Sequence, residues 1–227
     1  MKGEEEKRLN DKLLAAAASG DSARLGLLIA AGADVESRDV DGWTAIMRAA
    51  YRGHQDCLDR LLDAGAGLEV KDAGWWSASI GAAINGKDGC LRALIGAGAE
   101  LDAKCKKGRT AAMWAARNGQ DACMDLLIGA GADLDARDEE GLTAAMWAAR
   151  NGHEACMALL IGAGADIEAK DKDERTAAAW AASKGRAQLA SFIEAVQLSR
   201  SEAEQMRRET GGASVGAKPP GRRGPRV

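Results

Sequence analysis

Residues 108–131 read GRTAAMWAARNGQDACMDLLIGAG, and residues 141–164 repeat nearly the same letters as GLTAAMWAARNGHEACMALLIGAG. When residues 105–137 are aligned with residues 138–170, 23 of the 33 positions are identical. Two adjacent near-copies of one unit indicate a repeat protein, because stacked units of this size build a solenoid and not a single central core.

The same 33-residue period extends along most of the chain in three columns of residues. One glycine column is Gly20, Gly53, Gly86, Gly119, Gly152 and Gly185, and a second, each member followed by Ala, is Gly32, Gly65, Gly98, Gly131 and Gly164. A hydroxyl column consists of Thr44, Ser77, Thr110, Thr143 and Thr176. Together the columns define the unit D-x-x-G-x-T-A-x-x-x-A-A-x-x-G-(12 residues)-G-A.

The helices of one unit can be predicted from its apolar positions. Residues 111–118 form a short helix with alanines on one face and Trp114, Arg117 and Asn118 on the opposite face. Gly119 ends this helix, and a second helix follows it up to the next glycine column. Neither helix can bury its apolar face alone, so the units must stack, and the segments between units form protruding turns.

This unit resembles the ankyrin repeat, whose 33-residue period carries a T-P-L-H-x-A pattern. The resemblance covers roughly residues 13–196. Two positions depart from the family pattern: alanine replaces the proline, and Met, Ile or Ala replaces the histidine. The resemblance implies an all-α solenoid of stacked helix-turn-helix units with protruding β-turn or hairpin loops.

The period also predicts the organisation of the chain. We expect a charged leader at 1–12, an N-terminal cap at 13–38, repeats at 39–71, 72–104, 105–137 and 138–170, a C-terminal cap at 171–196, and a short helix followed by a disordered basic tail at 197–227. The repeat at 72–104 should be the least regular, because Trp75 occupies the turn position where most other units carry glycine.

Composition limits the cellular setting. The net charge of −3 combines +4 for residues 197–227, from seven Lys or Arg and three Glu, with −7 for residues 1–196. No apolar run approaches the roughly 20 residues that cross a bilayer, and the charged start does not resemble a signal peptide. We therefore expect an intracellular, cytoplasmic monomer without a membrane span.

Four cysteines also follow the period, namely Cys57, Cys90, Cys123 and Cys156. Neighbouring helices pack about 8 to 10 Å apart, whereas disulfide Cα atoms lie about 4.4 to 6.8 Å apart. These cysteines are therefore predicted to be buried free thiols. Cys105 lies outside the column, at the turn position where the other units carry Asp, and we expect it to be exposed and the first thiol to react.

No catalytic, metal or cofactor site is predicted. The two histidines, His54 and His153, are three repeats apart, which at about 10 Å per repeat is too far for a shared metal. Two columns of charge are expected to pair with each other. The acidic column is Glu36, Glu69, Asp102, Asp135 and Glu168, and the basic column is Arg38, Lys71, Lys104, Arg137 and Lys170.

In the ankyrin family the first helices and the turn tips line a concave binding groove, so the resemblance implies that these residues bind a partner. Exposed Trp and Arg are typical of binding hot spots. The expected partner-binding residues are Trp43, Arg48, Tyr51, Arg52, Trp76, Lys106, Lys107, Arg109, Trp114, Arg117, Asn118, Glu139, Glu140, Trp147, Arg150, Asn151 and Trp180. Alternatively, the Trp side chains pack over neighbouring repeats as a stacking ladder.

We therefore predict a non-catalytic protein-protein interaction module, acting as an adaptor, scaffold or regulatory subunit, that binds another protein along the concave face. The sequence does not identify that partner. The alternative function is binding of an anionic ligand or nucleic acid through the groove arginines and the basic tail. Nucleic acid is the less favoured partner, because no aromatic residues interleave with the charges of the tail.

Overall fold

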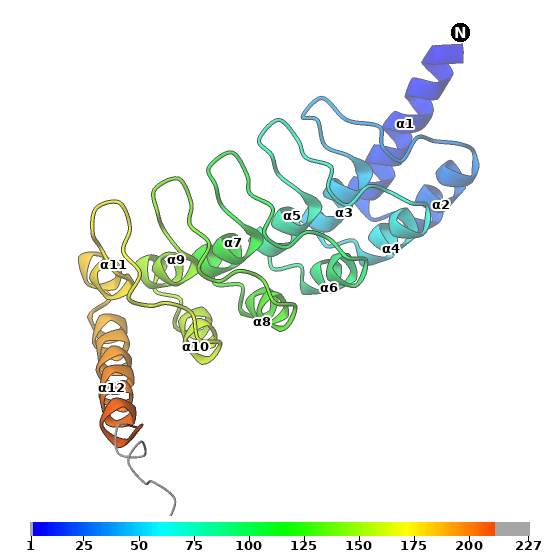
Figure 1. The fold of residues 1–227 in the computed structure, drawn as a ribbon. Coiled ribbons are helices and arrows are strands. Elements are labelled where there is room, and N and C mark those ends of the chain that lie inside the picture. Colours follow the sequence, from blue (N-terminus) through cyan, green and yellow to red (C-terminus); the bar gives the residue numbers. More distant parts are fainter. Residues whose placement is uncertain (1, 212–227) are drawn as a thin grey trace, which may run out of the picture.

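The computed structural model describes residues 2–211, which form twelve α-helices and no strand in that range. The helices alternate between two layers along the solenoid (Figure 1). The first helices of the units are α1 (Lys2–Ser19), α3 (Ala45–Arg52), α5 (Ala78–Ile84), α7 (Ala111–Asn118), α9 (Ala144–Asn151) and α11 (Ala177–Ser183). The second helices are α2 (Ser22–Ala30), α4 (Gln55–Asp63), α6 (Asp88–Gly96), α8 (Asp121–Gly129), α10 (Glu154–Gly162) and α12 (Ala187–Gly211). The predicted all-α repeat solenoid is confirmed.

The ends of the first helices follow from two residues of the repeating unit. The Thr110 hydroxyl accepts a hydrogen bond from the Met113 amide over 3.4 Å and caps the start of α7. Gly119 follows α7 with a φ of 67°, in the left-handed region that glycine adopts without strain. The same two residue types therefore begin and end the equivalent helix of the next unit.

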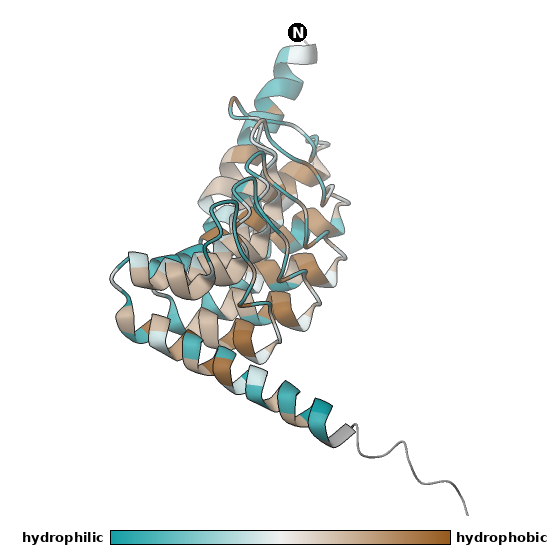
Figure 2. Ribbon diagram, turned by 60° about the vertical axis from the view of Figure 1, so that its left-hand side comes forward, coloured by the Kyte–Doolittle hydropathy of each residue, from teal (hydrophilic) through white to brown (hydrophobic). Residues whose placement is uncertain are grey.

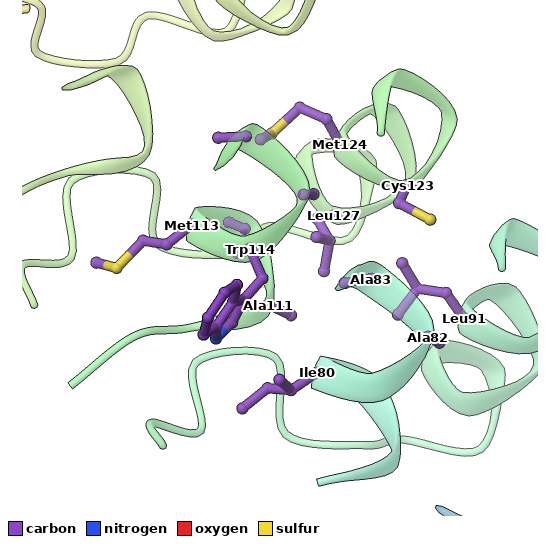
Figure 3. Packing of buried hydrophobic residues seen from close by; sticks show 14 of the residues in the cluster. Ile80, Ala82, Ala83, Leu91, Ala111, Met113, Trp114, Cys123, Met124 and Leu127 are labelled. Atoms are coloured by element: carbon purple, nitrogen blue, oxygen red, sulfur yellow. The ribbon is translucent and has the colours of Figure 1, made fainter. Parts of the chain in front are cut away.

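The core lies between the two helix layers and runs the length of the array. Figure 3 shows part of it, with Ile80 of α5, Ala111 of α7 and Leu127 of α8 among the buried side chains, and Met113 of α7 pointing away from Ile80. The small alanine side chains allow neighbouring first helices to pack closely. Hydrophilic residues gather on the turns and on the distal half of α12 (Figure 2).

A column of polar side chains joins several units to the unit before them. His153 Nε2 lies 3.0 Å from the carbonyl oxygen of Arg117, at the end of the preceding first helix, and His54 Nε2 lies 3.2 Å from that of Ala18. Gln120 occupies the same column and donates to the Ile84 carbonyl over 3.5 Å. The two histidines therefore cap helix ends, with the proton on Nε2.

The two charge columns do not pair with each other within residues 2–211, so this expectation is wrong. Acidic side chains accept hydrogen bonds from amides of the next unit, as Glu36 Oε1 does from the Gly67 amide over 2.6 Å. Basic side chains donate to carbonyls of the next unit, as Lys104 Nζ does to that of Arg137 over 3.1 Å. Main-chain amides and carbonyls at the unit boundary need hydrogen-bond partners. The acidic side chains serve the amides, and the basic side chains serve the carbonyls.

The protruding segments, which we call the tips, are residues 39–43, 72–76, 105–109, 138–142 and 171–175. Single main-chain hydrogen bonds join successive tips from the second onward. They run from the Lys106 amide to the Gly74 carbonyl (3.0 Å), from Glu139 to Lys107 (3.1 Å) and from Lys172 to Glu140 (3.2 Å). The later tips therefore form one continuous row.

The helices at the two ends of the array, α1 and α12, are longer than those of the repeats. Helix α1 begins at Lys2, so residues 2–12 are helical and continuous with the N-terminal cap. Helix α12 continues past Val196, and its Arg200 donates hydrogen bonds to the Ile161 and Ala165 carbonyls at the end of α10. The expected basic tail lies outside the described residues. No helix among residues 2–211 has both the length and the apolar character for a membrane crossing.

Candidate functional site: the inner face

Three tryptophans occupy one position of successive first helices, on the surface that the first helices and tips form together, which we call the inner face. Trp114, Trp147 and Trp180 are only 8%, 4% and 6% exposed. The expectation that these rings are exposed is therefore wrong, whereas their partner-binding role stays a prediction. Side chains from the tips and from neighbouring units cover the rings, as the stacking alternative requires.

Arginines lie between the tryptophan rings. The guanidinium carbon of Arg117 is 4.9 Å from the ring centre of Trp114 and 5.1 Å from that of Trp147. The corresponding distances for Arg150 are 5.1 Å to Trp147 and 4.6 Å to Trp180. Cation–π contacts of this kind contribute about 0.5 to 2 kcal/mol each. Each of these two arginines therefore links two successive units.

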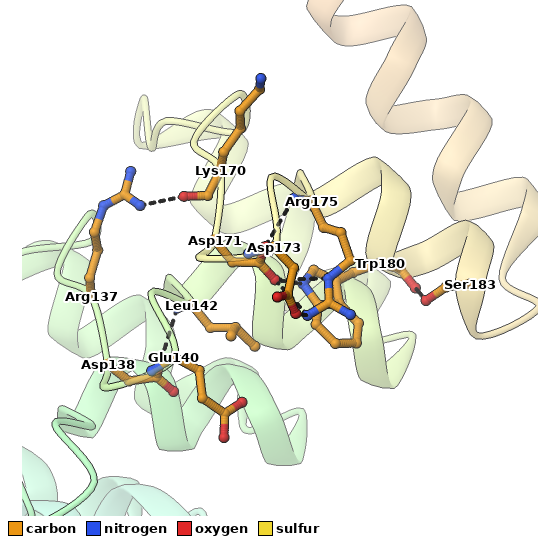
Figure 4. A network of polar contacts seen from close by, with 10 residues as sticks. All are labelled: Arg137, Asp138, Glu140, Leu142, Lys170, Asp171, Asp173, Arg175, Trp180 and Ser183. Atoms are coloured by element: carbon orange, nitrogen blue, oxygen red, sulfur yellow. Dashed lines mark hydrogen bonds and ion pairs between the residues drawn. The ribbon is translucent and has the colours of Figure 1, made fainter.

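The indole nitrogens of the last two tryptophans donate to aspartates at the tips. Trp147 Nε1 donates to Asp138 Oδ2 over 3.1 Å. Trp180 Nε1 donates to Asp171 Oδ2 over 2.9 Å, the pair shown in Figure 4. The other carboxylate oxygen of each aspartate accepts from the main-chain amides two and four residues further on. Burial opposes the ionisation of Asp171, but the hydrogen bonds outweigh it and hold the pKa of this carboxyl below its ordinary value.

The third tip lacks this aspartate, because Cys105 stands in its place. Cys105 is only 4% exposed, so the expectation of an exposed thiol is wrong. Its main-chain amide donates to the Arg109 carbonyl inside the tip over 3.0 Å. Within residues 2–211, Trp114 Nε1 is buried and has no hydrogen-bond partner.

Charged tip residues divide into two groups. Lys106, Lys107, Glu139 and Glu140 are exposed, in keeping with a surface that can meet a partner. Arg109 is buried, and its Nε donates to Asp138 Oδ2 of the next tip over 3.2 Å. Arg109 therefore holds two tips together, and the partner-binding role expected of it stays a prediction.

The inner face is hollowed between the first two full repeats. Gly81 occupies the position that Trp114 fills one unit later, and Tyr51 packs beside this glycine. Tyr51 also lines a hollow of about 580 Å³. Its lining residues are Asp41, Trp43, Arg48, Tyr51, Arg52, Asp72 and Trp76. The hollow thus brings together five of the residues expected to bind a partner.

The walls of the hollow are held in place by contacts among themselves. The Trp43 ring meets Tyr51 edge-on, with ring centres 5.1 Å apart, and its Nε1 donates to Asp72 Oδ2 over 2.8 Å. Arg48 lies over the Trp43 ring at 4.6 Å and donates to Asp39 over 2.7 Å. Aromatic and guanidinium groups therefore face the hollow in fixed positions.

Comparison with known proteins agrees with this architecture. Residues 13–104, 79–171 and 112–197 each match the family model described as ankyrin repeats in three copies. The chain belongs to the ankyrin repeat family. An ankyrin repeat protein of Rickettsia felis is 46% identical over 56 residues, which are 25% of this chain and 89% of that protein. Ankyrin repeats are generally non-catalytic modules for protein-protein interaction.

Two exposed apolar residues on the tips of this ankyrin array were not among the expected binding residues. Val40 is fully exposed, and Trp75 is 55% exposed. Trp75 has a φ of 63°, where Gly42, Gly108 and Gly141 occupy the same place in other tips. The signal that could have identified it was present in the sequence, as a tryptophan in a column of glycines.

The remaining expected residues have modest roles in the ankyrin array. Asn118 donates to the Ile84 carbonyl and Asn151 to the Trp147 carbonyl, each over 2.8 Å, so both amides secure helix ends. Among the described residues no group of three or more His, Cys, Asp or Glu side chains could hold a metal ion. The hollow and the row formed by Arg117 and Arg150 are therefore the parts of the inner face whose binding role is considered next.

Proposed function

We propose that this chain is a non-catalytic interaction module, an adaptor, scaffold or regulatory subunit, that binds a segment of another protein along the inner face. The observation that carries the proposal is the hollow between the repeats at 39–71 and 72–104. Protein interfaces gain most of their binding energy from a few Trp, Tyr and Arg residues in pockets. Trp43, Tyr51 and Trp76 supply such walls here.

Preorganisation supports this role. Because Trp43 and Arg48 are held by aspartates, a partner would not have to order these side chains, which reduces the entropic cost of binding. The tip beside the hollow presents Trp75 in a left-handed backbone conformation that costs a bulky residue about 1 to 2 kcal/mol. Strain of this kind is common at functional sites.

The five cysteines are free thiols, which supports an intracellular, cytoplasmic place of action. A monomeric chain would leave the inner face open to the partner.

Filling the hollow tests the proposal. A Cβ added at Gly81 would meet the Tyr51 Cβ at 3.6 Å, an ordinary contact, so Gly81→Trp adds its ring beside a residue that lines the hollow, and thermal melting checks that the variant folds. The matched control is Gly96→Trp at the end of α6, where an added Cβ meets nothing within 4 Å. The full chain would be used for affinity capture with mass spectrometry, and the purified partner would then be titrated by calorimetry.

We expect Gly81→Trp to weaken partner binding by about tenfold or more, the scale of a hot-spot loss, while Gly96→Trp leaves it unchanged. Both variants should retain the native melting temperature within a few degrees. Undiminished binding by Gly81→Trp, or failure of the native chain to capture any protein, would show that the proposal is wrong.

A further inference from the structure

Arg117 and Arg150 lie at equivalent positions of α7 and α9, and each contacts two tryptophan rings. Within residues 2–211, neither guanidinium has a carboxylate within 4 Å. Both side chains are partly exposed on the inner face. They are therefore cations that the fold positions but does not neutralise.

The other arginines that lie over these aromatic rings are paired. Arg48 contacts Asp41 at 2.8 Å, Arg109 contacts Asp138 at 3.2 Å, and Arg175 contacts Asp171 at 3.1 Å. The tip aspartates thus neutralise the arginines nearest the tips. The two unpaired arginines lie further along the first helices, beyond the reach of those carboxylates.

The electrostatic surroundings of Arg117 agree with an unneutralised site. Partial burial lowers the pKa of this guanidinium, and repulsion from Arg109 and Arg150 lowers it further. A carboxylate brought by a ligand would relieve that repulsion. The site therefore favours an anion over a neutral group.

The stacking geometry indicates the form of the anion. A guanidinium that lies over aromatic rings still has its N–H donors in its own plane, and this edge matches the two oxygens of a carboxylate. Equivalent positions of adjacent units are about 8 to 10 Å apart. In a polyproline II segment, three residues advance about 9 Å and return to the same side of the chain.

We propose that Arg117 and Arg150 bind two carboxylates, three residues apart, on an extended acidic segment of the partner protein. This inference rests on the function proposed above and identifies the chemistry of the segment that lies along the inner face. The aromatic hollow would then receive an apolar part of the same partner, one to two repeats away.

A polyanion such as nucleic acid fits the array less well. Residues 1–196 carry a net charge of −7, and Glu139 and Glu140 are exposed on the tip between the two arginine positions. A long chain of phosphates would meet this repulsion at every contact, whereas a peptide need bring only two negative charges.

A peptide selection tests the proposal. A random library of 12-residue peptides would be selected on the full chain and, in parallel, on the double variant Arg117→Gln/Arg150→Gln, whose folding is checked by thermal melting. Affinities of the selected peptides would be measured by fluorescence anisotropy. Arg92→Gln is the matched control, since Arg92 is an exposed arginine of α6 that lies outside the inner face.

Peptides enriched on the native chain should carry two acidic residues three positions apart. Replacing both acids by Gln should reduce affinity about tenfold or more, as loss of charge-assisted hydrogen bonds does. The Arg117→Gln/Arg150→Gln variant should show the same loss, with little further effect when both changes are combined. Arg117→Lys/Arg150→Lys should lie between, because lysine retains the charge without the planar edge.

Enrichment of peptides without acidic pairs overturns the proposal, and so does an affinity that changes less than about twofold when Glu becomes Gln. The peptide substitution decides the matter even if the double variant fails to fold. Displacement of the selected peptide by a single-stranded oligonucleotide at equal charge concentration also overturns it, since charge alone would then suffice. If the selection enriches apolar peptides alone, and these bind the native chain but not Gly81→Trp, this inference is overturned and the proposed function stands.

Discussion

Trp114 Nε1 is buried without an acceptor in the described chain because Cys105 stands where the neighbouring tips carry aspartate. In both later units, an aspartate nine residues before the tryptophan accepts the indole proton. The third unit therefore contains a built-in defect in an otherwise repeated network, and the defect can be repaired by one substitution.

We expect Cys105→Asp to stabilise the array by about 1 to 2 kcal/mol, because the new carboxylate can accept from Trp114 Nε1 and from main-chain amides of the tip. Urea unfolding of the full chain measures the gain. Cys105→Ser is the matched control, since its hydroxyl is too short to serve all of these donors. A Cys105→Asp chain no more stable than the serine variant would contradict this account of the tip.

Buried and exposed tryptophans should respond very differently to truncation. Trp147→Ala removes a ring that is 4% exposed together with its cation–π contacts, and we expect a loss of about 3 to 5 kcal/mol. Trp75→Ala removes a ring that is 55% exposed and should cost less than about 1 kcal/mol. Equal losses in a denaturant titration would mean that the inner-face stack is not structural.

The strained tip should be relieved by glycine. Because Trp75 has a φ of 63°, we expect Trp75→Gly to stabilise the fold by about 1 kcal/mol. Gly141→Ala is the opposite test, since its φ is 82° and an added Cβ would meet the Lys172 amide nitrogen at 3.1 Å. It should destabilise the chain, and a melting temperature unchanged by both substitutions would refute the assignment of strain.

Buried thiols predict a loss of stability in alkali. Burial raises the pKa of the Cys90 and Cys123 thiols from 9.0 to about 11 each. The unfolded chain ionises first, so this contribution is complete below pH 9 and is lost as the pH rises from 9 towards 11. Urea midpoints measured across that window should fall, and those of Cys90→Ala/Cys123→Ala should fall less. If the urea midpoints of the native chain and the double variant fall equally with pH, the thiols are not the cause of the loss of stability.

Much of the fold could be predicted from the sequence, because one repeated unit fixes its own helix ends. The helix predicted over residues 111–118 is found at Ala111–Asn118, between the capping Thr110 and Gly119. The cysteine column is buried and free of disulfides, as its spacing predicts. These features depend on contacts within a unit or between identical positions, which a periodic sequence displays directly.

The surface was harder to predict, because a helical wheel describes one helix without its neighbours. It places Trp147 opposite the alanine face, but it does not show that Arg109, Arg117 and Arg150 lie over the ring. Exposure of Cys105 was inferred from its place in a turn, whereas the nine-residue spacing to Trp114 was the informative pattern. Burial on this face depends on side chains up to a full unit away.

The row of tips has a consequence for the order in which the array opens. Main-chain hydrogen bonds join every pair of successive tips except the first two, which the described chain connects through Trp43 Nε1 and Asp72 instead. Among the described tips, amide hydrogen exchange should therefore be fastest at residues 39–43, because this tip shares no main-chain hydrogen bond with the next one. The hollow lies at that same boundary. A ligand bound in the hollow would slow amide exchange at the N-terminal end of the solenoid. Hydrogen exchange could therefore report ligand binding even if the fold does not change.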